Sequence, residues 1–204
     1  MTRKLASLTT VAHRTIYDLI PGGSRVLDLG CGKGELLAAL MQDKQVAGQG
    51  VEIDENHVIE CLNQGIPIVQ GNLDEGLKEY PDGSYDYVIL NQTLQSVYHT
   101  ELLLTELLRV GKKAVVGIPN FAHWRIRLTL ALTGTLPKTS VLNFEWYNTP
   151  NIRLVTVKDF KKVCAVMGIR VLEEFYSTGN RALPPPFRFR PNLFCENALF
   201  VIGK

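Results

Sequence analysis

The sequence lacks a strong excess of charge of either sign. Its 22 Lys and Arg residues are matched by 20 Asp and Glu, which gives a formal net charge of +2. A dedicated nucleic-acid-binding protein needs many unpaired basic residues to neutralise phosphates, so we expect no nucleic acid among the partners. With 46% hydrophobic residues, the 204-residue chain also differs from disordered sequences. Its length predicts one domain, covering 1–204.

Long apolar runs are missing too. The longest stretch without Asp, Glu, Lys or Arg is 87–100, which is rich in Asn, Gln, Ser and Thr. A membrane span needs about 20 apolar residues. Thr9, His13 and Asp18 also interrupt the region where a signal peptide would have its apolar core. We therefore expect a cytoplasmic protein with no membrane partner.

Motifs for metals and redox chemistry are absent as well. No two cysteines form a C-x-x-C pair, so neither a zinc ribbon nor a redox motif is indicated. His13, His57 and His99 are scattered without metal-ligand spacing. We expect no bound metal, and reduced thiols at all four cysteines. These are Cys31, Cys61, Cys164 and Cys195.

Short apolar runs alternate with segments of helical periodicity along most of the chain. The expected strands are Arg25–Leu29, Val46–Ile53, Ile66–Gln70, Tyr85–Leu90, Lys113–Ile118, Ile169–Tyr176 and Leu199–Ile202. The expected helices are an N-terminal helix within 1–20, then Gly34–Gln42, Glu55–Gln64, Thr100–Arg109 and Val157–Met167. Continuous apolar runs are typical of strands buried on both faces, and their alternation with helices predicts an α/β fold with a parallel sheet.

Three segments break this alternation. Leu73–Ser84 is short and rich in turn residues, which predicts a degenerate helix. The block 120–151 crowds aromatic residues after the fifth strand, where an insertion can cover the carboxyl edge of the sheet; Asn120 could cap a helix over Phe121–Leu132. Ser177–Asn197 contains four prolines and is expected to be irregular.

The motif that carries chemistry is a glycine-rich turn between the first strand and the next helix. Asp28 is followed by Gly30, Gly32 and Gly34. Glycines let the backbone turn sharply and approach a ligand, here outside the carboxyl end of a strand, where α/β sheets bind nucleotides. A dinucleotide fingerprint would have its third glycine at position 35, which is Glu35, and no P-loop pattern exists. The D-x-G-x-G-x-G spacing instead resembles motif I of class I S-adenosylmethionine-dependent methyltransferases, whose cofactor has no phosphate for Glu35 to repel.

Two further strand ends match this resemblance. Glu52 ends the second strand, where it would accept the ribose hydroxyls, with Asp54 beside it. Asn72 follows the third strand, where the family holds adenine with an Asp and the next backbone amide. Each feature alone could be a tight turn or a solvated acid, but their shared register favours a cofactor site. The expected cofactor-binding residues are Asp28, Gly30, Cys31, Gly32, Gly34, Glu52, Ile53, Asn72, Leu73 and Asn91.

A narrower resemblance covers nearly the whole chain. It is carried by Arg25–Leu37, Gly50–Asp54, Tyr85–Val97, Ile118–Leu128 and Phe144–Asn151. These segments resemble MetW, a family of bacterial methionine biosynthesis proteins. The resemblance implies a Rossmann-like class I methyltransferase fold: a mostly parallel seven-stranded sheet with an antiparallel last strand and helices on both faces. It also implies S-adenosylmethionine or S-adenosylhomocysteine as cofactor. The implied partner is a homoserine O-acetyl- or O-succinyltransferase, for which 120–151 and 177–197 are possible contact surfaces.

Catalysis itself has weaker support in the sequence. Methyl transfer needs an aligned nucleophile and, for some substrates, a general base. The tetrapeptide that begins at Asn91 is not the [N/D]-P-P-[Y/F] signature of amino-methyltransferases. Asn91, His123 and Tyr147 are the candidate catalytic residues, although His and Tyr also pack in half-buried sites. Two functions therefore stay open: an accessory or regulatory subunit of the acyltransferase, and an active methyltransferase on a small molecule or pathway protein.

Overall fold

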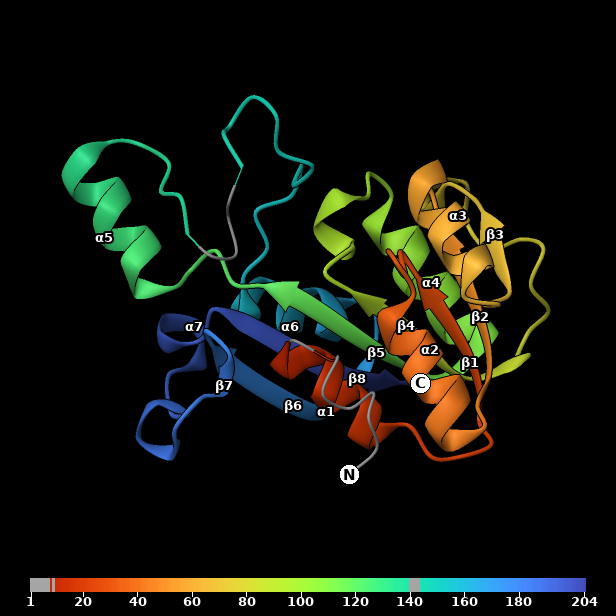
Figure 1. Cartoon of the computed structure of the whole chain (residues 1–204). Helices are drawn as coiled ribbons and strands as arrows, with labels where there is room; N and C mark the ends of the chain where they lie inside the picture. Colours follow the sequence, from red (N-terminus) through yellow and green to blue (C-terminus); the bar gives the residue numbers. More distant parts are fainter. Residues whose placement is uncertain (1–7, 9, 140–143) are drawn as a thin grey trace.

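The computed structural model describes residues 8, 10–139 and 144–204, and its centre is one eight-stranded sheet (Figure 1). The strands are β1 (Arg25–Leu29), β2 (Ala47–Glu52), β3 (Ile68–Gln70), β4 (Tyr85–Asn91), β5 (Gly111–Pro119), β6 (Arg170–Thr178), β7 (Arg181–Ala182) and β8 (Asn197–Gly203). Their order across the sheet is β3-β2-β1-β4-β5-β8-β6-β7. Strands β1 to β5 are parallel, and the last strand, β8, lies antiparallel between β5 and β6. This is the predicted α/β sheet with an antiparallel last strand.

The additional strand corrects the prediction of seven strands. β7 pairs with the end of β6 as a hairpin, Ser177 opposite Ala182 and Thr178 opposite Arg181. The hairpin forms because Gly179 adopts φ 51°, which a two-residue turn requires. The segment 177–197 was expected to be irregular. It contains the end of β6 and the strand β7, and it then continues through two short helical segments, Pro185–Phe187 and Pro191–Phe194.

Helices cover both faces of the sheet, as predicted. They are α1 (Val11–Leu19), α2 (Glu35–Lys44), α3 (Glu55–Asn63), α4 (Thr100–Val110), α5 (Trp124–Thr133), α6 (Val157–Val166) and α7 (Pro191–Phe194), with 3₁₀ turns η1 (Leu73–Glu75), η2 (Leu94–Ser96) and η3 (Pro185–Phe187). Side chains of α1, α2 and α3 pack with Val26 of β1, whereas α4 and α6 pack with Leu27, its neighbour on the opposite face. η1 is the degenerate helix expected within Leu73–Ser84. No helix in the described part of the chain is long and apolar enough to cross a membrane.

Helix α1 is shorter than the expected N-terminal helix. It begins after Thr10, whose side-chain oxygen accepts a hydrogen bond from the His13 amide at 3.1 Å; residues 1–7 and 9 lie outside the described residues. Its C-terminal end is tied to α2, because the Lys44 ammonium donates to the carbonyl oxygens of Tyr17 and Ile20. A cation at a helix C-terminus satisfies carbonyl groups that have no partner within the helix.

The block 120–151 differs most from its prediction. Asn120 does not cap α5. It is 2% exposed, its side-chain amide group donates to the Cys195 carbonyl oxygen at 2.8 Å, and its side-chain oxygen accepts from the amide of Val157, the first residue of α6, at 3.4 Å. The side-chain oxygen of Asn120 also accepts from the backbone amide of Ala122 in a tight turn. Helix α5 therefore starts only at Trp124, after His123. None of the residues of α5 is buried, and the helix stands away from the sheet beyond β5 (Figure 1).

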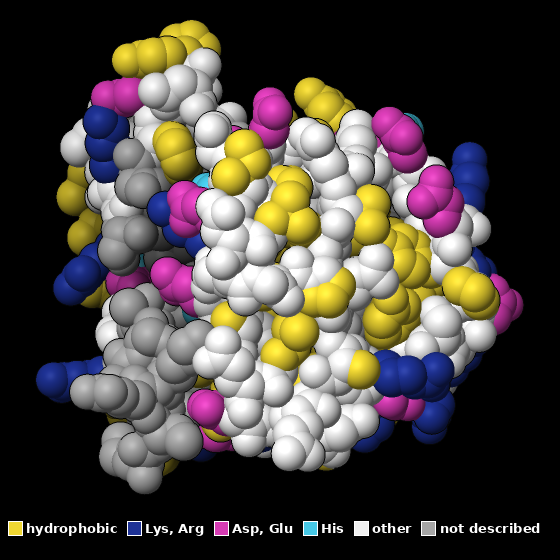
Figure 2. Space-filling view, turned by 45° about the vertical axis from the view of Figure 1, so that its right-hand side comes forward, with side chains coloured by type: hydrophobic (Ala, Val, Ile, Leu, Met, Phe, Trp, Pro, Cys, Tyr) yellow, Lys and Arg dark blue, Asp and Glu magenta, His cyan; other side chains and the backbone are white. Residues whose placement is uncertain are grey.

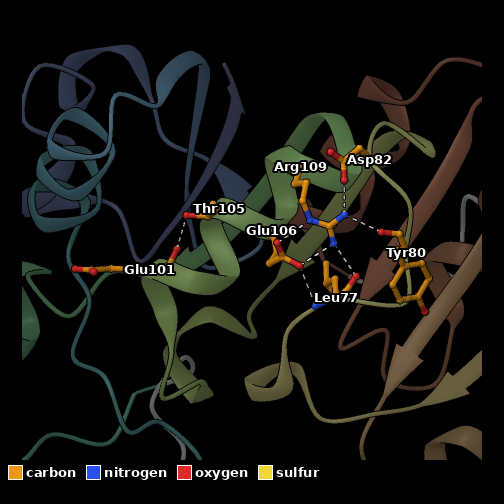
Figure 3. A network of polar contacts seen from close by, with 7 residues as sticks. All are labelled: Leu77, Tyr80, Asp82, Glu101, Thr105, Glu106 and Arg109. Atoms are coloured by element: carbon orange, nitrogen blue, oxygen red, sulfur yellow. Dashed lines mark hydrogen bonds and ion pairs between the residues drawn. The ribbon is translucent and has the colours of Figure 1, made fainter.

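A single guanidinium group organises the loop that precedes β4. Arg109, in the last turn of α4, donates to the carbonyl oxygens of Leu77 and Tyr80, both at 2.8 Å (Figure 3). It also forms ion pairs with Glu106 at 2.7 Å and Asp82 at 2.6 Å. Glu106 in turn accepts from the Leu77 amide, and hydrogen bonding to Arg109 holds the pKa of Glu106 below its usual value. The loop is thereby fixed to α4 by backbone and side-chain contacts together.

We expect Arg109→Met to lower the free energy of unfolding by about 2 kcal/mol, because Glu106 and two carbonyl groups lose charge-assisted hydrogen bonds. Urea unfolding measures the change. Lys112→Met is the matched control: Lys112 is 66% exposed and forms one ion pair, with Asp86, so its loss should cost well under about 1 kcal/mol. Equal costs for the two variants would contradict the role given to Arg109.

Candidate functional site

The candidate site lies where the order of the sheet reverses. From β1 the chain adds β2 and β3 on one side, then returns to place β4 and β5 on the other. Open α/β sheets bind ligands in the crevice outside the carboxyl ends of strands at such a switch point. Here those ends belong to β1, which leads into the glycine-rich turn, and to β4, whose last residue is Asn91.

The three glycines of the turn have different reasons to be glycine. Gly30, Gly32 and Gly34 all have positive φ angles, 71°, 55° and 74°. A Cβ atom on Gly30 would lie 2.4 Å from the Thr93 hydroxyl, and one on Gly34 would lie 2.8 Å from the Cys61 sulfur. A Cβ atom on Gly32 would meet nothing within 4 Å. Packing therefore requires Gly30 and Gly34, whereas Gly32 presents bare backbone to open space.

Glu52 ties the end of β2 to this turn. One carboxylate oxygen accepts from the Gly32 amide at 2.8 Å, and the other accepts from the Ile53 and Asp54 amides at 2.8 and 3.1 Å. The residue is 8% exposed. The structure thus brings together two residues that are 20 positions apart and that the sequence assigned to one site. Asp54 has a structural task as well, since it caps α3 through the Asn56 and His57 amides.

Asp28 adds a second buried carboxyl group near the first. It lies on β1 and is 4% exposed. Burial raises its pKa to about 7, and the neighbouring charge of Glu52 raises it in the same direction. A buried carboxyl group without a cation nearby favours its protonated form. The edge between β1 and β2 is therefore a place where a positive charge or a hydroxyl donor would be stabilised.

Two hollows lie at the carboxyl ends of these strands, although Asp28 and Glu52 are not among the described residues that line them. The larger, of about 560 Å³, lies beyond the end of β3 and includes Asn72 and Leu73, the predicted adenine station, together with His99 and Leu102. Asn72 also caps η1, because its oxygen accepts from the Asp74 amide at 3.1 Å. Figure 2 shows the molecule turned by 45° from the view of Figure 1, with separate groups of apolar side chains among polar ones on that face and charged side chains mostly around its rim. The lining of the hollow is mixed, with apolar side chains such as Val69, Leu73 and Leu102 beside charged ones such as Asp74 and Lys78.

The second hollow, of about 480 Å³, lies beside the glycine-rich turn. Four predicted residues line it, Gly30, Cys31, Gly32 and Asn91. The rest of its lining was not predicted from the sequence. These residues are Thr10, Ala12, His13, Lys33, Glu35, Gln92 and Asn197. The sequence places Thr10 and His13 within the expected N-terminal helix of 1–20. It could not show that this helix would lie against the turn, because that contact joins segments distant in sequence.

The candidate catalytic residues lie in separate places. Asn91 lines the second hollow, at the end of β4. His123 is 4% exposed at the start of α5, next to Trp124, and burial lowers its pKa. Tyr147 is 70% exposed and packs edge-on against Trp146. Neither His123 nor Tyr147 is among the described residues that line the two hollows.

The chain is similar to proteins of methionine biosynthesis. The model of a family described as "Methionine biosynthesis protein MetW" matches residues 11–202. The bifunctional methionine biosynthesis protein MetXA/MetW of Rhodopirellula baltica is 36% identical over 206 residues, which cover 95% of this chain and 33% of that protein. This chain thus spans about a third of the length of that relative.

Solved structures share the fold at low identity. A S-adenosylmethionine-dependent methyltransferase from Mesorhizobium loti has a TM-score of 0.68 at 17% identity, covering 95% of this chain and 98% of that one. The [4+2]-cyclase SpnF has a TM-score of 0.64 at 17% identity, covering 93% and 80%. These likenesses show the predicted methyltransferase-type fold. Fold alone does not assign the reaction.

The raised pKa of Asp28 predicts a pH dependence of stability. Its native value of about 7 exceeds the ordinary 3.8, so between these values the native state binds more protons than the unfolded state. Asp28 therefore makes stability fall as the pH rises from about 4 to about 7, by up to about 1.4 kcal/mol per pH unit. Asp28→Asn should remove this loss, so the variant should gain roughly 1–3 kcal/mol relative to wild type between pH 5 and pH 8 in urea unfolding.

Asp86→Asn is the control for this measurement. A hydrogen bond from the Arg25 amide lowers the pKa of Asp86 to about 2, so this carboxyl group stays ionised at both pH values. Its substitution should change stability equally at pH 5 and pH 8. If Asp28→Asn also showed no difference between the two, Asp28 would not be the group that titrates.

Proposed function

This chain belongs to the MetW family of methionine biosynthesis proteins, and from that premise we propose that it binds S-adenosylmethionine and acts as an accessory or regulatory subunit of a homoserine O-acyltransferase. The observation that carries the first part is the bare backbone of Gly32, held by Glu52 beside the buried Asp28. In a regulatory role, the binding of S-adenosylmethionine, a downstream product of the pathway, would adjust the activity of the acyltransferase, which catalyses an early step.

The residues present fit this cofactor. The turn Gly30–Gly34 would receive its amino-acid part. The three backbone amides leave about one of the four lone-pair sites of the Glu52 carboxylate free, on the oxygen that Gly32 contacts, and this site would accept a ribose hydroxyl. Asn72 and Leu73 would adjoin the adenine. The bound cofactor would supply a positively charged sulfonium with an activated methyl group. Asp28 suits that charge, because a cation nearby stabilises its ionised form.

The geometry favours binding over methyl transfer. Transfer requires a nucleophile held in line with the methyl group. Of the three candidate catalytic residues, only Asn91 lines a hollow beside the turn. An active methyltransferase remains the second proposal, favoured by the space of about 480 Å³ next to Gly32, which could admit a small acceptor.

The fused relative supports the acyltransferase partner. The Rhodopirellula baltica protein carries a MetXA part and a MetW part in one polypeptide, as its name states. Joining two proteins raises their effective concentration toward each other, which is advantageous when they act together. We propose that the chain described above likewise acts together with the corresponding acyltransferase.

One face of the molecule suits such an encounter. It combines α5 with the segment 177–197, which lie on the same side of the molecule, far from β3 (Figure 1). The Arg127 guanidinium links them through the Asn192 carbonyl oxygen at 3.5 Å. Leu132 is 75% and Phe189 71% exposed on these two segments. Exposed aromatic and aliphatic side chains beside arginine are typical of protein interfaces.

Cofactor binding is tested by a matched pair of glycine substitutions. Gly32→Ala should weaken S-adenosylmethionine binding at least tenfold in isothermal titration calorimetry, because the added methyl group fills space needed by the ligand. Gly23→Ala is the control, since Gly23 also has a positive φ, 73°, and nothing within 4 Å of a Cβ atom, but lies outside the site. Both variants should lose similar stability. Equal affinities would refute the assigned cradle.

The partner role is tested by acyl transfer to homoserine. The rate of the cognate acyltransferase is measured with and without this chain, with S-adenosylmethionine titrated in and S-adenosylhomocysteine followed. A rate that depends on the chain, without S-adenosylhomocysteine formation, is the expected result. Leu132→Lys on α5 should weaken the effect, whereas Leu62→Lys, also on an exposed helix position, should not. An unchanged rate would exclude that partner, and product formation would favour the methyltransferase.

A further inference from the structure

A third hollow lies between helix α1 and the end of the sheet that β6, β7 and β8 form (Figure 1). Its volume is about 280 Å³, and among its described lining residues only Ala12 also lines the hollow beside the glycine-rich turn. Its walls are mostly apolar, with Val11 and Ala12 from α1, Phe175 from β6 and Leu199 from β8. Small-molecule sites are commonly of this kind, apolar with a few polar groups that fix the orientation of the ligand.

One polar side chain in this hollow has no partner. Ser177, near the end of β6, is 8% exposed, and its hydroxyl group makes no hydrogen bond to another described residue. Side chains alternate along a strand, so Ser177 lies on the same face as Phe175, which packs with the core cluster that contains Ile16 of α1. Buried polar groups are nearly always hydrogen-bonded in native proteins, so this hydroxyl group indicates a ligand or a water molecule in the hollow.

The free charge at the hollow is positive. Glu174 is the one acid among the described lining residues, and it is engaged by the Lys161 ammonium at 2.6 Å and by the Tyr176 hydroxyl group. Arg188 is the one base among them, and it forms no ion pair with a described acid. Its Nε donates to the Leu183 carbonyl oxygen at 2.8 Å, which leaves the terminal nitrogens as donors. Such a guanidinium suits a carboxylate, to which it donates charge-assisted hydrogen bonds.

The loop that carries Arg188 is held in place. The Phe187 ring packs edge-on against Phe194, with ring centroids 4.9 Å apart. Leu183 is 1% exposed, and its amide donates to the Tyr176 carbonyl oxygen at 2.8 Å, which ties the loop to β6. The guanidinium therefore has its position before a ligand arrives, which lowers the entropic cost of binding.

We infer that this hollow binds a small carboxylate with an aliphatic tail. The carboxylate contacts Arg188 and Ser177, and the tail lies against the apolar walls. An alcohol with the same tail gains the burial of apolar surface but no ion pair, and an ammonium with the same tail is repelled by Arg188. The inference does not depend on the proposed cofactor or on the proposed partner.

Hexanoate, hexan-1-ol and hexylammonium are the probes, because they share one tail and differ in charge. In NMR titrations of the wild-type protein, hexanoate should bind and shift the amide signals of Ser177 and Ala182. Hexanol should bind more weakly, and hexylammonium should not bind. Arg188→Gln should weaken hexanoate binding about fivefold, as expected for a partly solvated ion pair, and leave hexanol binding unchanged. Arg190→Gln, on the same loop but not among the lining residues, should change neither.

A second variant fills the hollow without touching its charge. Ala182 lies directly opposite Ser177 in the β6–β7 hairpin, so the two side chains share a face. Ala182→Leu should therefore place its larger side chain over Ser177 and abolish the binding of hexanoate and hexanol alike. Ala182 is exposed, so the fold should tolerate the change. Thr178→Leu, on the other face of the same hairpin, is the control and should leave both affinities unchanged.

Absence of hexanoate binding to the wild-type protein overturns the inference. Amide shifts confined to other parts of the chain overturn it too, as does hexanoate binding that neither Arg188→Gln nor Ala182→Leu weakens. Equal weakening of hexanoate and hexanol by Arg188→Gln overturns the carboxylate contact. The affinity for S-adenosylmethionine should be unchanged in Ala182→Leu, since Ala182 does not line the hollow beside the glycine-rich turn, and its loss would overturn the separation of the two sites.

Discussion

The contact on which the site depends is the carboxylate of Glu52 with three backbone N–H groups. It fixes the turn after β1 to the end of β2, so that the bare backbone of Gly32 faces open space. Three hydrogen bonds to one side chain hold the turn and the end of β2 in a fixed relation to each other. The two flanking glycines then follow from packing, because Thr93 and Cys61 leave no room for a side chain.

Much of this could be predicted from the sequence, where local pattern carries the information. Alternating apolar runs gave the sheet and both layers of helices, and the spacing of Asp28, Gly32 and Glu52 placed them at one edge. Asn120 shows where such reasoning fails: an Asn before a helical pattern resembles a cap, but its partner is Cys195, far along the chain. The approach of His13 to the turn was invisible for the same reason, since only the packing of α1 on the sheet creates it.

The fold and the surface give the protein two separable parts. The carboxyl edge of β1, β2 and β4 has buried acids and open backbone, which are features of a small-molecule site. The helix α5 and the loop 177–197 instead expose apolar side chains away from that edge (Figure 1). Under the proposed function, the first part would bind the metabolite and the second would contact the acyltransferase. Communication between them would require that the ligand favour one of two states of the connecting segment.

Helix α1 is held at both ends. Lys44 secures its C-terminal carbonyl groups. At its N-terminal end, Thr10 caps the first turn, Arg14 Nε donates to the Leu8 carbonyl oxygen at 3.0 Å, and Leu8 itself is fully buried. The side of the hollow beside the glycine-rich turn that α1 lines is therefore already shaped before any ligand arrives, so a ligand that binds there would lose little affinity to the ordering of this helix.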